Sequence, residues 1–278
     1  MVDISELSLA EKREIASYIK EDTLEKVNKL MVPAKQKVSF YTKYGKRLMD
    51  ILVGMAGLIV SIPFNLVIAI VTFFDVGRPI LFKQERMGKD SKPFTIYKFR
   101  NMTNDTDING DLLLASERVT RWGKFVRKTS LDELLNFIPV IKGDMSIIGP
   151  RPLLEAYSER LHNRHKSIYM VRSGLECPTL YSVDHALSWQ ERLDNYVWYV
   201  ENCSLWVDIR LCFRIVAIAL DRKSTEQRAT ANHGGLLGYD LEGNVVYTKA
   251  VPEKYVELFL KNHGFSSLDE AIVARKFS

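Results

Sequence analysis

The sequence predicts an α+β protein that is mostly helical and sits on one side of a membrane. The first observation is one uncharged apolar run, Ile51–Phe74, in a chain that otherwise carries charges throughout. The second is a series of segments whose apolar residues recur at helical spacing. The third is that strand-like alternation is confined to short stretches near residues 80–100 and 239–247. We therefore expect a monotopic membrane protein with a re-entrant helix–break–helix, a small β-hairpin and interfacial amphipathic helices.

Composition and charge narrow the range of partners. The chain has 278 residues and a net charge of +5, which suits phosphate-bearing partners or an anionic membrane surface and does not indicate nucleic acid. Its three cysteines include no Cys-x-x-Cys pair and are interpreted as reduced thiols of a cytosol-facing protein. The polar, acidic N-terminus does not predict a cleaved signal peptide. The apolar and aromatic helices leave a homo-oligomer open, and no sequence feature specifies its symmetry.

The chain begins with a predicted N-terminal helical extension, residues 1–42. Ser8 and Glu11 form the two ends of a capping box, and apolar residues follow at helical spacing. We interpret residues 8–30 as a helix that ends before Pro33 and is followed by a linker. We assign no chemistry to this segment.

The apolar run defines the second segment, residues 43–78. Its 24 uncharged residues would rise roughly 36 Å as one straight helix, enough to cross a bilayer. Pro63 at its middle removes a backbone hydrogen bond, Ser61 and Asn65 can satisfy the freed groups, and each half spans only about 18 Å. Cations flank both ends, as expected if both ends lie on the cytosolic side. We predict a re-entrant helix–break–helix, with a Pro-kinked full span and a buried soluble helix as the alternatives.

Residues 79–222 are expected to form a cytosolic domain at the membrane face. Apolar and polar residues alternate over residues 80–100 on both sides of Gly88, which predicts a two-stranded hairpin. The hairpin leads to Lys98 and Arg100, two cations on one face of an extended segment. These cations are candidates for binding phosphate, although solvated surface cations are the default interpretation.

The candidate site lies between Arg118 and Leu154. Five cations come first, the carboxylates of Asp132 and Glu133 follow, and two Gly-containing turns close the segment. Cations beside a carboxylate lower its pKa and keep it ionised, as a nucleophile requires. They would also neutralise a phosphate that arrives beside it. This order of residues therefore predicts a phosphate-handling site.

The carboxylate pair also has a purely structural interpretation. Ser130–Glu133 is a capping box, and acidic residues are favoured in the first turn of a helix. The same tetrapeptide recurs at Ser267–Glu270, so by itself it predicts only that a helix begins. Context separates the two copies, because the first follows Arg127-Lys128 and precedes two glycine turns, whereas the second has neither.

The rest of the chain is predicted to form helices that pack in the core or lie at the membrane interface, followed by a C-terminal appendage. Residues 188–200 predict an aromatic helix suited to a core or a membrane interface. Residues 205–220 predict an amphipathic helix that would lie in the interface plane. A polar boundary then begins the C-terminal appendage, residues 223–278, with a hairpin around Gly243 and two helices.

These residues resemble those of a known family. Over roughly residues 43–222 the chain is similar to the bacterial sugar transferases, the monotopic phosphoglycosyl transferases that start glycoconjugate synthesis on polyprenyl phosphate. The motifs that carry the resemblance are Lys46-Arg47-x-x-Asp50, the Pro63 break, Gln84-x-Arg86-x-Gly88, Tyr97-Lys98-Phe99-Arg100-x-Met102, Arg127-x-x-Ser130-Leu131-Asp132-Glu133-Leu134 and Lys142-Gly143-Asp144-Met145-Ser146-Ile147-Ile148-Gly149-Pro150-Arg151-Pro152-Leu153. The last two, in tandem, are the most specific.

The resemblance implies an enzyme of the bacterial inner membrane, with a cytoplasmic active site and Mg²⁺ as cofactor. It implies that Asp132 attacks the β-phosphorus of a UDP-sugar and expels UMP, and that polyprenyl phosphate then takes the sugar-phosphate from Asp132. Asp132 would also contact Mg²⁺, and Glu133 would assist as a base or metal partner. The substrate-binding residues would be Arg127, Arg151, Lys98, Arg100 and Pro150.

The chain departs from the family pattern in three places. Ile62 stands where the family usually has Ser before the breaking Pro, residues 173–184 keep the family's length without its polar chemistry, and Tyr196 occupies the place of an acid, with Asp194 nearby. The altered 173–184 loop leaves open the alternative of a catalytically silent, membrane-anchored UDP-sugar-binding or regulatory protein. A third hypothesis is a lipid-phosphate hydrolase. The donor sugar is not specified by the sequence.

Overall fold

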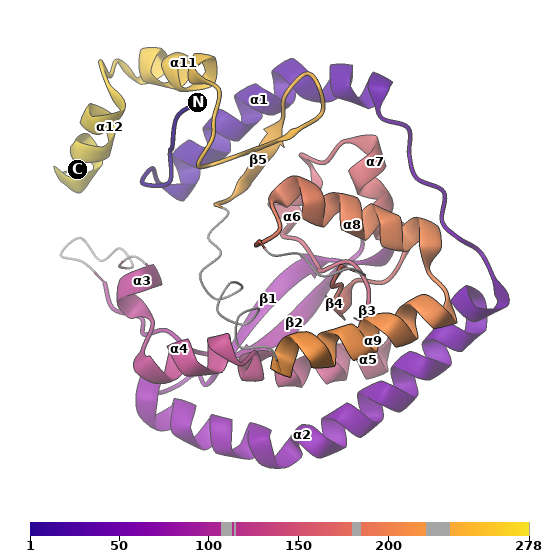
Figure 1. Cartoon of the computed structure of the whole chain (residues 1–278). Helices are drawn as coiled ribbons and strands as arrows, with labels where there is room; N and C mark the ends of the chain where they lie inside the picture. Colours follow the sequence, from indigo (N-terminus) through magenta and orange to yellow (C-terminus); the bar gives the residue numbers. More distant parts are fainter. Residues whose placement is uncertain (107–112, 114, 180–184, 221–233, 278) are drawn as a thin grey trace.

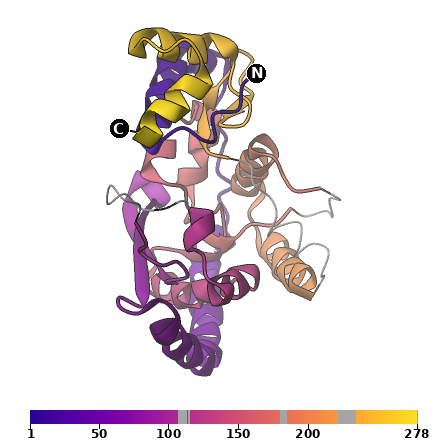
Figure 2. The ribbon, with the colours of Figure 1, turned by 90° about the vertical axis from the view of Figure 1, so that its left-hand side faces the viewer.

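The long apolar helix and the two chain termini lie at opposite ends of the protein (Figures 1 and 2). The computed structural model describes the chain outside residues 107–112, 114, 180–184, 221–233 and 278. Its α-helices are α1 (Leu9–Leu30), α2 (Lys46–Val76), α3 (Ala115–Arg118), α4 (Arg121–Lys128), α5 (Phe137–Lys142), α6 (Glu155–Ser158), α7 (Asn163–Lys166), α8 (Trp189–Asn202), α9 (Leu205–Leu220), α11 (Glu253–His263) and α12 (Leu268–Phe277). Shorter helical turns are the π-turn η1 (Tyr41–Gly45) and the 3₁₀ turns η2 (Lys89–Ser91), η3 (Leu131–Asn136) and η4 (Ser167–Met170). The strands are β1 (Leu81–Met87), β2 (Pro93–Phe99), β3 (Ser146–Ile148), β4 (Gly174–Glu176), β5 (Leu236–Tyr239) and β6 (Val245–Tyr247). The predicted class, mostly helical with small sheets, is confirmed.

The apolar run forms α2, a helix of 31 residues that belongs to a segment long and apolar enough to cross a membrane. The backbone stays helical through Pro63, so the predicted break is replaced by a continuous helix. Figure 1 shows that α2 is bowed and that the rest of the protein lies on its concave side, as expected for a helix with an internal proline. Ser61 Oγ donates to the Leu58 carbonyl at 2.9 Å and accepts from Asn65 Nδ2 at 3.1 Å, so both polar neighbours of Pro63 bond within the helix.

The surface of α2 is divided into a protein-facing stripe and a broad apolar outer face. The buried stripe consists of Asp50, Gly54, Ser61, Ile68 and Thr72. At Gly57 an added Cβ would lie 2.6 Å from the Phe137 ring of α5, so a glycine is needed for the two helices to approach. The outer face exposes large apolar side chains, among them Leu52, Ile59, Ile62, Phe64, Leu66 and Phe74. The alternative of a buried soluble helix is therefore wrong, and the exposed apolar face is of the kind that contacts a membrane or a partner.

Two small sheets lie between α2 and the termini. β1 and β2 pair antiparallel from Leu81–Phe99 to Met87–Pro93, which confirms the predicted hairpin. β3 and β4 pair in parallel and are joined by the segment that contains α6, α7 and η4. The main core surrounds β3 and includes Val140, Ile148, Leu161, Leu193 and Tyr199. Packing in this core fixes the position of the segment after β3, and that segment carries Arg151.

The two chain termini share a second core. Val2 pairs with Val251 in an antiparallel bridge, and α1, β5 and α11 bury Ile15, Ile19, Leu237, Val256 and Phe259 together. The segments 1–42 and 223–278 were predicted as two separate appendages, and their described parts, up to residue 42 and from residue 234, thus pack against each other. Local patterns do not reveal such a contact, because the pairing of distant segments leaves no periodicity in either one.

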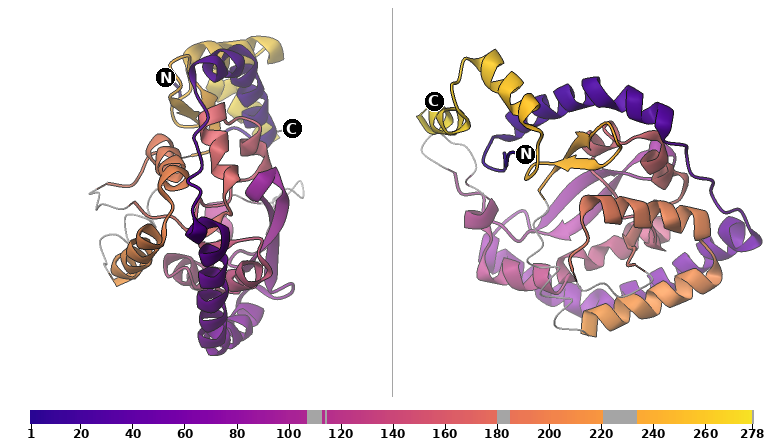
Figure 3. Two further views of the ribbon diagram at one scale, coloured as in Figure 1. Left: turned by 90° about the vertical axis from the view of Figure 1, so that its right-hand side faces the viewer. Right: turned by 45° about the horizontal axis from the view of Figure 1, so that its top comes forward.

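Several local predictions in these regions are confirmed. Ser8 and Glu11 form both hydrogen bonds of the capping box at the start of α1. β5 and β6 pair around Gly243, and α11 lies between Pro252 and the left-handed Gly264. The predicted amphipathic helix is α9, which buries Asp208 and Leu211 and exposes Trp206, Phe213 and Val216. The left view of Figure 3 shows that α8 and α9, drawn in orange, lie to one side of a line from α1 to α2.

Candidate active site

Asp132 and Glu133 lie in η3, between α4 and α5. Ser130 has a left-handed backbone (φ 56°) and makes no side-chain cap, so the predicted capping box is wrong at this copy of the tetrapeptide. At the second copy, Ser267 Oγ accepts from the Glu270 backbone N–H at 3.2 Å, as a cap should. An N-cap residue needs an extended backbone, which Ser130 lacks. The Glu133 side chain also has stronger partners than the backbone amide of Ser130.

Those partners are two cations from other parts of the chain. Lys98 Nζ of β2 lies 2.7 Å from Glu133 Oε1, and Arg151 Nη2, from the segment after β3, lies 2.5 Å from the same oxygen. Burial acts to raise the pKa of Glu133, but the charges of Arg151 and Lys98 outweigh it and the pKa is lowered. Glu133 is therefore an ionised anchor that draws three segments together.

Asp132 is in a different environment. Its side chain is 5% exposed, and its Oδ2 accepts a hydrogen bond from Asn101 Nδ2 at 3.0 Å. Burial, followed by the neighbouring charge of Glu133, raises its pKa to about 6, and the charges of Lys98 and Arg127 only partly oppose this. The expectation that the cations would lower the pKa of Asp132 is wrong, because desolvation is the larger effect. The carboxylate is nevertheless mostly ionised at neutral pH.

This raised pKa predicts a measurable effect on stability. Between pH 4 and pH 6 the folded state keeps the Asp132 proton that the unfolded state has lost, so the wild-type free energy of unfolding falls as pH rises. The shift from 3.8 to about 6 corresponds to about 3 kcal/mol. We expect Asp132→Asn to match the wild type near pH 4 and to be more stable at pH 7–8, by up to about 3 kcal/mol. Thermal unfolding of both proteins across this pH range measures the difference, and a constant difference would contradict the assignment.

The remaining predicted site residues differ in their exposure and in their contacts. Arg127 is exposed at the end of α4, and its charge acts on Asp132. Arg100 turns away from Glu133 and donates from Nη1 to the Arg78 carbonyl at 3.2 Å. Pro150 is buried, and its carbonyl accepts from the Gly174 N–H at 2.9 Å, which gives it a structural contact.

Glu133 and Arg151 form part of the wall of a cavity of about 140 Å³. The cavity also contains side chains that the sequence did not single out as site residues, namely Arg86, Arg192, Tyr157, Trp189 and Tyr196. Burial and the nearby charge of Arg151 lower the pKa of Arg86. The alternation of β1 could have indicated Arg86, since Gln84 and Arg86 lie on the same face of the strand. A cavity with this excess of cations is suited to phosphate groups.

The backbone under Arg151 depends on two glycines. An added Cβ on Gly174 would lie 2.1 Å from the Gly149 nitrogen, so β4 can approach the turn after β3 only without a side chain. We expect Gly174→Ala to lower the free energy of unfolding by about 1–3 kcal/mol and to reduce activity by displacing Arg151. Gly235→Ala is the control, because its nearest contact is the movable Tyr157 hydroxyl at 3.2 Å. Equal unfolding free energies for the two variants would contradict this.

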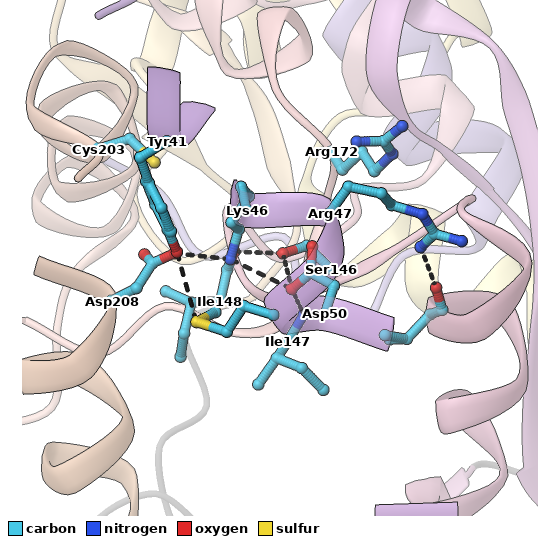
Figure 4. Close-up of polar contacts among 12 residues, drawn as sticks. Tyr41, Lys46, Arg47, Asp50, Ser146, Ile147, Ile148, Arg172, Cys203 and Asp208 are labelled. Atoms are coloured by element: carbon cyan, nitrogen blue, oxygen red, sulfur yellow. Dashed lines mark hydrogen bonds and ion pairs between the residues drawn. The ribbon is translucent and has the colours of Figure 1, made fainter. Parts of the chain in front are cut away.

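A buried polar network connects the beginning of α2 to strand β3 (Figure 4). Asp50 accepts from Ser146 Oγ at 2.9 Å and from the Ile147 N–H at 3.0 Å. Lys46 Nζ lies 3.3 Å from Asp50 and 2.8 Å from Asp208 of α9. The membrane helix, β3 and α9 are therefore joined at one point, which positions the site relative to the membrane.

The geometry defines a class, namely proteins that combine a long apolar helix, of a length that could cross a membrane, with a pair of carboxylates beside a cation-lined cavity. Within that class, the sequence model described as "Bacterial sugar transferase" matches residues 41–222, so the chain belongs to the bacterial sugar transferase family. The match covers α2 and the candidate site and leaves out the two terminal segments.

Three similar proteins, all described as sugar or sugar-phosphate transferases, agree with this assignment. The chain is 38% identical over 175 residues to the uncharacterized sugar transferase EpsL of Bacillus subtilis (strain 168), covering 61% of this chain and 85% of that protein. It is 34% identical to the UDP-N-acetylgalactosamine-undecaprenyl-phosphate N-acetylgalactosaminephosphotransferase of Aeromonas hydrophila, covering 63% and 43%. It is also 34% identical to the UDP-glucose:undecaprenyl-phosphate glucose-1-phosphate transferase of Klebsiella pneumoniae, covering 64% and 41%. The chain thus spans less than half the length of these last two relatives.

Proposed function

We propose that this protein transfers a sugar-1-phosphate from a UDP-sugar to polyprenyl (undecaprenyl) phosphate and so starts glycoconjugate or polysaccharide synthesis. The observation that carries the proposal is the pairing of two unlike carboxylates. Within the part of the chain that the structure describes, Asp132 is buried with a single bond from another side chain, that of Asn101, whereas Glu133 is neutralised by Lys98 and Arg151. Such a pair leaves one carboxylate reactive and the other structural.

The chemistry divides into two steps on one phosphorus atom. An Asp132 carboxylate oxygen forms a bond to the β-phosphorus of the donor, the bond between that phosphorus and the bridging oxygen breaks, and UMP leaves with the bonding electrons. A phosphate oxygen of the lipid then attacks the same phosphorus and releases the Asp132 carboxylate. Lys98, Arg127 and Arg151 supply positive charge where phosphate charge accumulates. A pKa of about 6 leaves Asp132 ionised and able to attack at cytosolic pH.

The residues present also fit Mg²⁺. Among the described residues no group of three or more His, Cys, Asp or Glu could hold a metal alone. Mg²⁺ in phosphate sites is held by one or two carboxylates together with substrate phosphates, and Asp132 can serve as that carboxylate. When bound, the ion would offset charge on the donor phosphates.

The proposal includes a re-entrant anchor in the bacterial inner membrane, with the active site facing the cytoplasm. The bowed α2, with the rest of the protein on its concave side, favours this over a kinked span. The cations Lys43 and Arg78 at its two ends agree. Cysteines introduced at positions 40 and 90 should both be labelled only from the cytoplasmic side. Labelling from opposite sides would establish a span instead.

One assay tests the function. Purified protein with Mg²⁺ is given a panel of UDP-sugars and scored for UMP with and without polyprenyl phosphate. We expect less than one equivalent of UMP per protein without the lipid, and turnover with it. Binding without UMP release would support a catalytically silent regulatory protein, and phosphate released from the lipid without nucleotide would support a hydrolase. Because the named relatives differ in sugar, the panel should include UDP-glucose and UDP-N-acetylgalactosamine.

A further inference from the structure

A second recess lies on the membrane side of the protein, at the C-terminal end of α2. It is a groove of about 810 Å³, much larger than the cavity beside Glu133. Its walls are Ala69, Ile70, Phe73, Phe74, Arg78, Pro79 and Ile80, all apolar except Arg78. Ile70 and Phe74 are 51% and 80% exposed on the outer face of α2, so the groove opens toward the bilayer. Its chemistry suits a hydrocarbon chain rather than a nucleotide.

Two arginines stand at the protein end of this groove. The Arg78 guanidinium is exposed and lies 5.7 Å from the centroid of the Phe73 ring. Arg100 donates to the Arg78 carbonyl from Nη1, while its Nε is buried and has no hydrogen-bond partner in the described part of the chain. Neither residue forms a salt bridge with a carboxylate among the described residues. Two guanidinium groups without a counter-ion, at the edge of an apolar groove, are suited to the phosphate of a lipid.

The groove is connected directly to Asp132. The Arg100 N–H donates to the Ile80 carbonyl at 2.9 Å, which joins the end of β2 to the groove wall. The next residue, Asn101, about 3.8 Å along the chain, donates to Asp132 at 3.0 Å. The segment that forms the groove wall therefore continues directly into the residue that bonds Asp132.

The end of α2 is also fastened to the catalytic segment. Ile68 of α2 packs with Phe99 and Val126 in a small buried cluster, against which Leu131 of η3 also packs. Asp75 of α2 accepts from Thr120 Oγ1, the N-cap of α4, at 2.6 Å. The groove wall and the segment that carries Asp132 are thus joined by packing and by a hydrogen bond.

We propose that this groove binds the isoprenyl chain of the acceptor lipid and that Arg78 and Arg100 bind its phosphate. The site is separate from the cavity beside Glu133 and Arg151, which is left for the donor. This inference rests on the proposed function, and it assigns the two substrates of that function to two different recesses. An anionic phospholipid of the bilayer is the competing occupant.

The experiment separates the two half-reactions in nanodiscs of zwitterionic phospholipid. Arg78→Ala removes a phosphate ligand, and Ile70→Trp fills the groove from an exposed position. Arg121→Ala on the exposed surface of α4 and Ile59→Trp on the outer face of α2 are the matched controls. The burst of UMP from UDP-sugar alone reports the donor step, and discharge of the trapped adduct by polyprenyl phosphate reports the acceptor step.

We expect both test variants to keep the UMP burst within twofold of wild type and to discharge the adduct at least tenfold more slowly. For Arg78→Ala a higher concentration of polyprenyl phosphate should be needed, and both controls should behave like wild type. Equal slowing of both steps, or normal discharge, would overturn the inference. The inference would also be overturned if an excess of anionic phospholipid blocked discharge of the adduct from the wild-type protein, since the groove would then be a general lipid site. Absence of a UMP burst from the wild type would instead refute the proposed function itself.

Discussion

Asp132→Asn is expected to lose sugar-phosphate transfer by at least about 10³-fold and to form no covalent adduct. The reason is that an amide oxygen is a poor nucleophile, whereas the fold around it is kept. Asn101 can still donate to the amide oxygen that replaces Asp132 Oδ2, so η3 should not change. UMP release and intact-protein mass spectrometry with UDP-sugar alone measure the two losses.

The chain supplies its own control for this variant. Asp269→Asn changes the same residue of the same tetrapeptide at an exposed position of α12, where the serine does cap a helix. It should leave transfer and adduct formation unchanged. An active Asp132→Asn enzyme, or a glycosyl-phosphoryl mass located on any residue other than Asp132, would refute the covalent mechanism.

Arg151→Lys is expected to lower kcat/KM for the UDP-sugar by about 10- to 150-fold. Arg151 bonds Glu133 through Nη2 and the Leu175 carbonyl through Nη1 at 3.3 Å, and one ammonium group cannot reproduce both contacts. A lost charge-assisted hydrogen bond contributes roughly 1.5–3 kcal/mol, which corresponds to this range. Steady-state kinetics over a range of UDP-sugar concentrations measures the effect.

A matched change on the surface distinguishes this effect from a general loss of charge. Arg121→Lys keeps a cation on exposed α4 and should be kinetically silent. If Arg151→Lys instead lowers the melting temperature with kcat/KM intact, Arg151 is a structural residue and the donor site must lie elsewhere.

The sequence allowed much of the local structure to be predicted. Helix 8–30, the hairpin over 80–100 and the helix over 205–220 are present because their signals are local, namely caps, alternation and helical periodicity. The two carboxylates of Asp132 and Glu133 could be recognised as a pair from the sequence, because the residues are adjacent in the chain. Asn101 was not selected as a site residue, because nothing in its local sequence shows that it faces Asp132, whereas for Arg86 the alternation of β1 indicated only the face of the strand and not the interaction with Glu133.

Three further features were decided by tertiary structure. Ser130 does not cap a helix, because its backbone is left-handed where a cap needs an extended one, and the Glu133 side chain is bound by other segments. Arg100 was predicted to bind substrate, and only the structure places its guanidinium at the Arg78 carbonyl beside the groove. The two terminal segments, which look independent along the chain, share a core.

By itself, the sequence indicated the family, the long apolar helix and the carboxylate that we propose as the nucleophile, because each is encoded in contiguous residues. The tertiary structure decided the protonation behaviour of Asp132 and the partners of Glu133. The reason is that desolvation and Coulomb interactions depend on distance in space, so an aspartate surrounded by cations along the chain has a raised pKa once folding removes it from water.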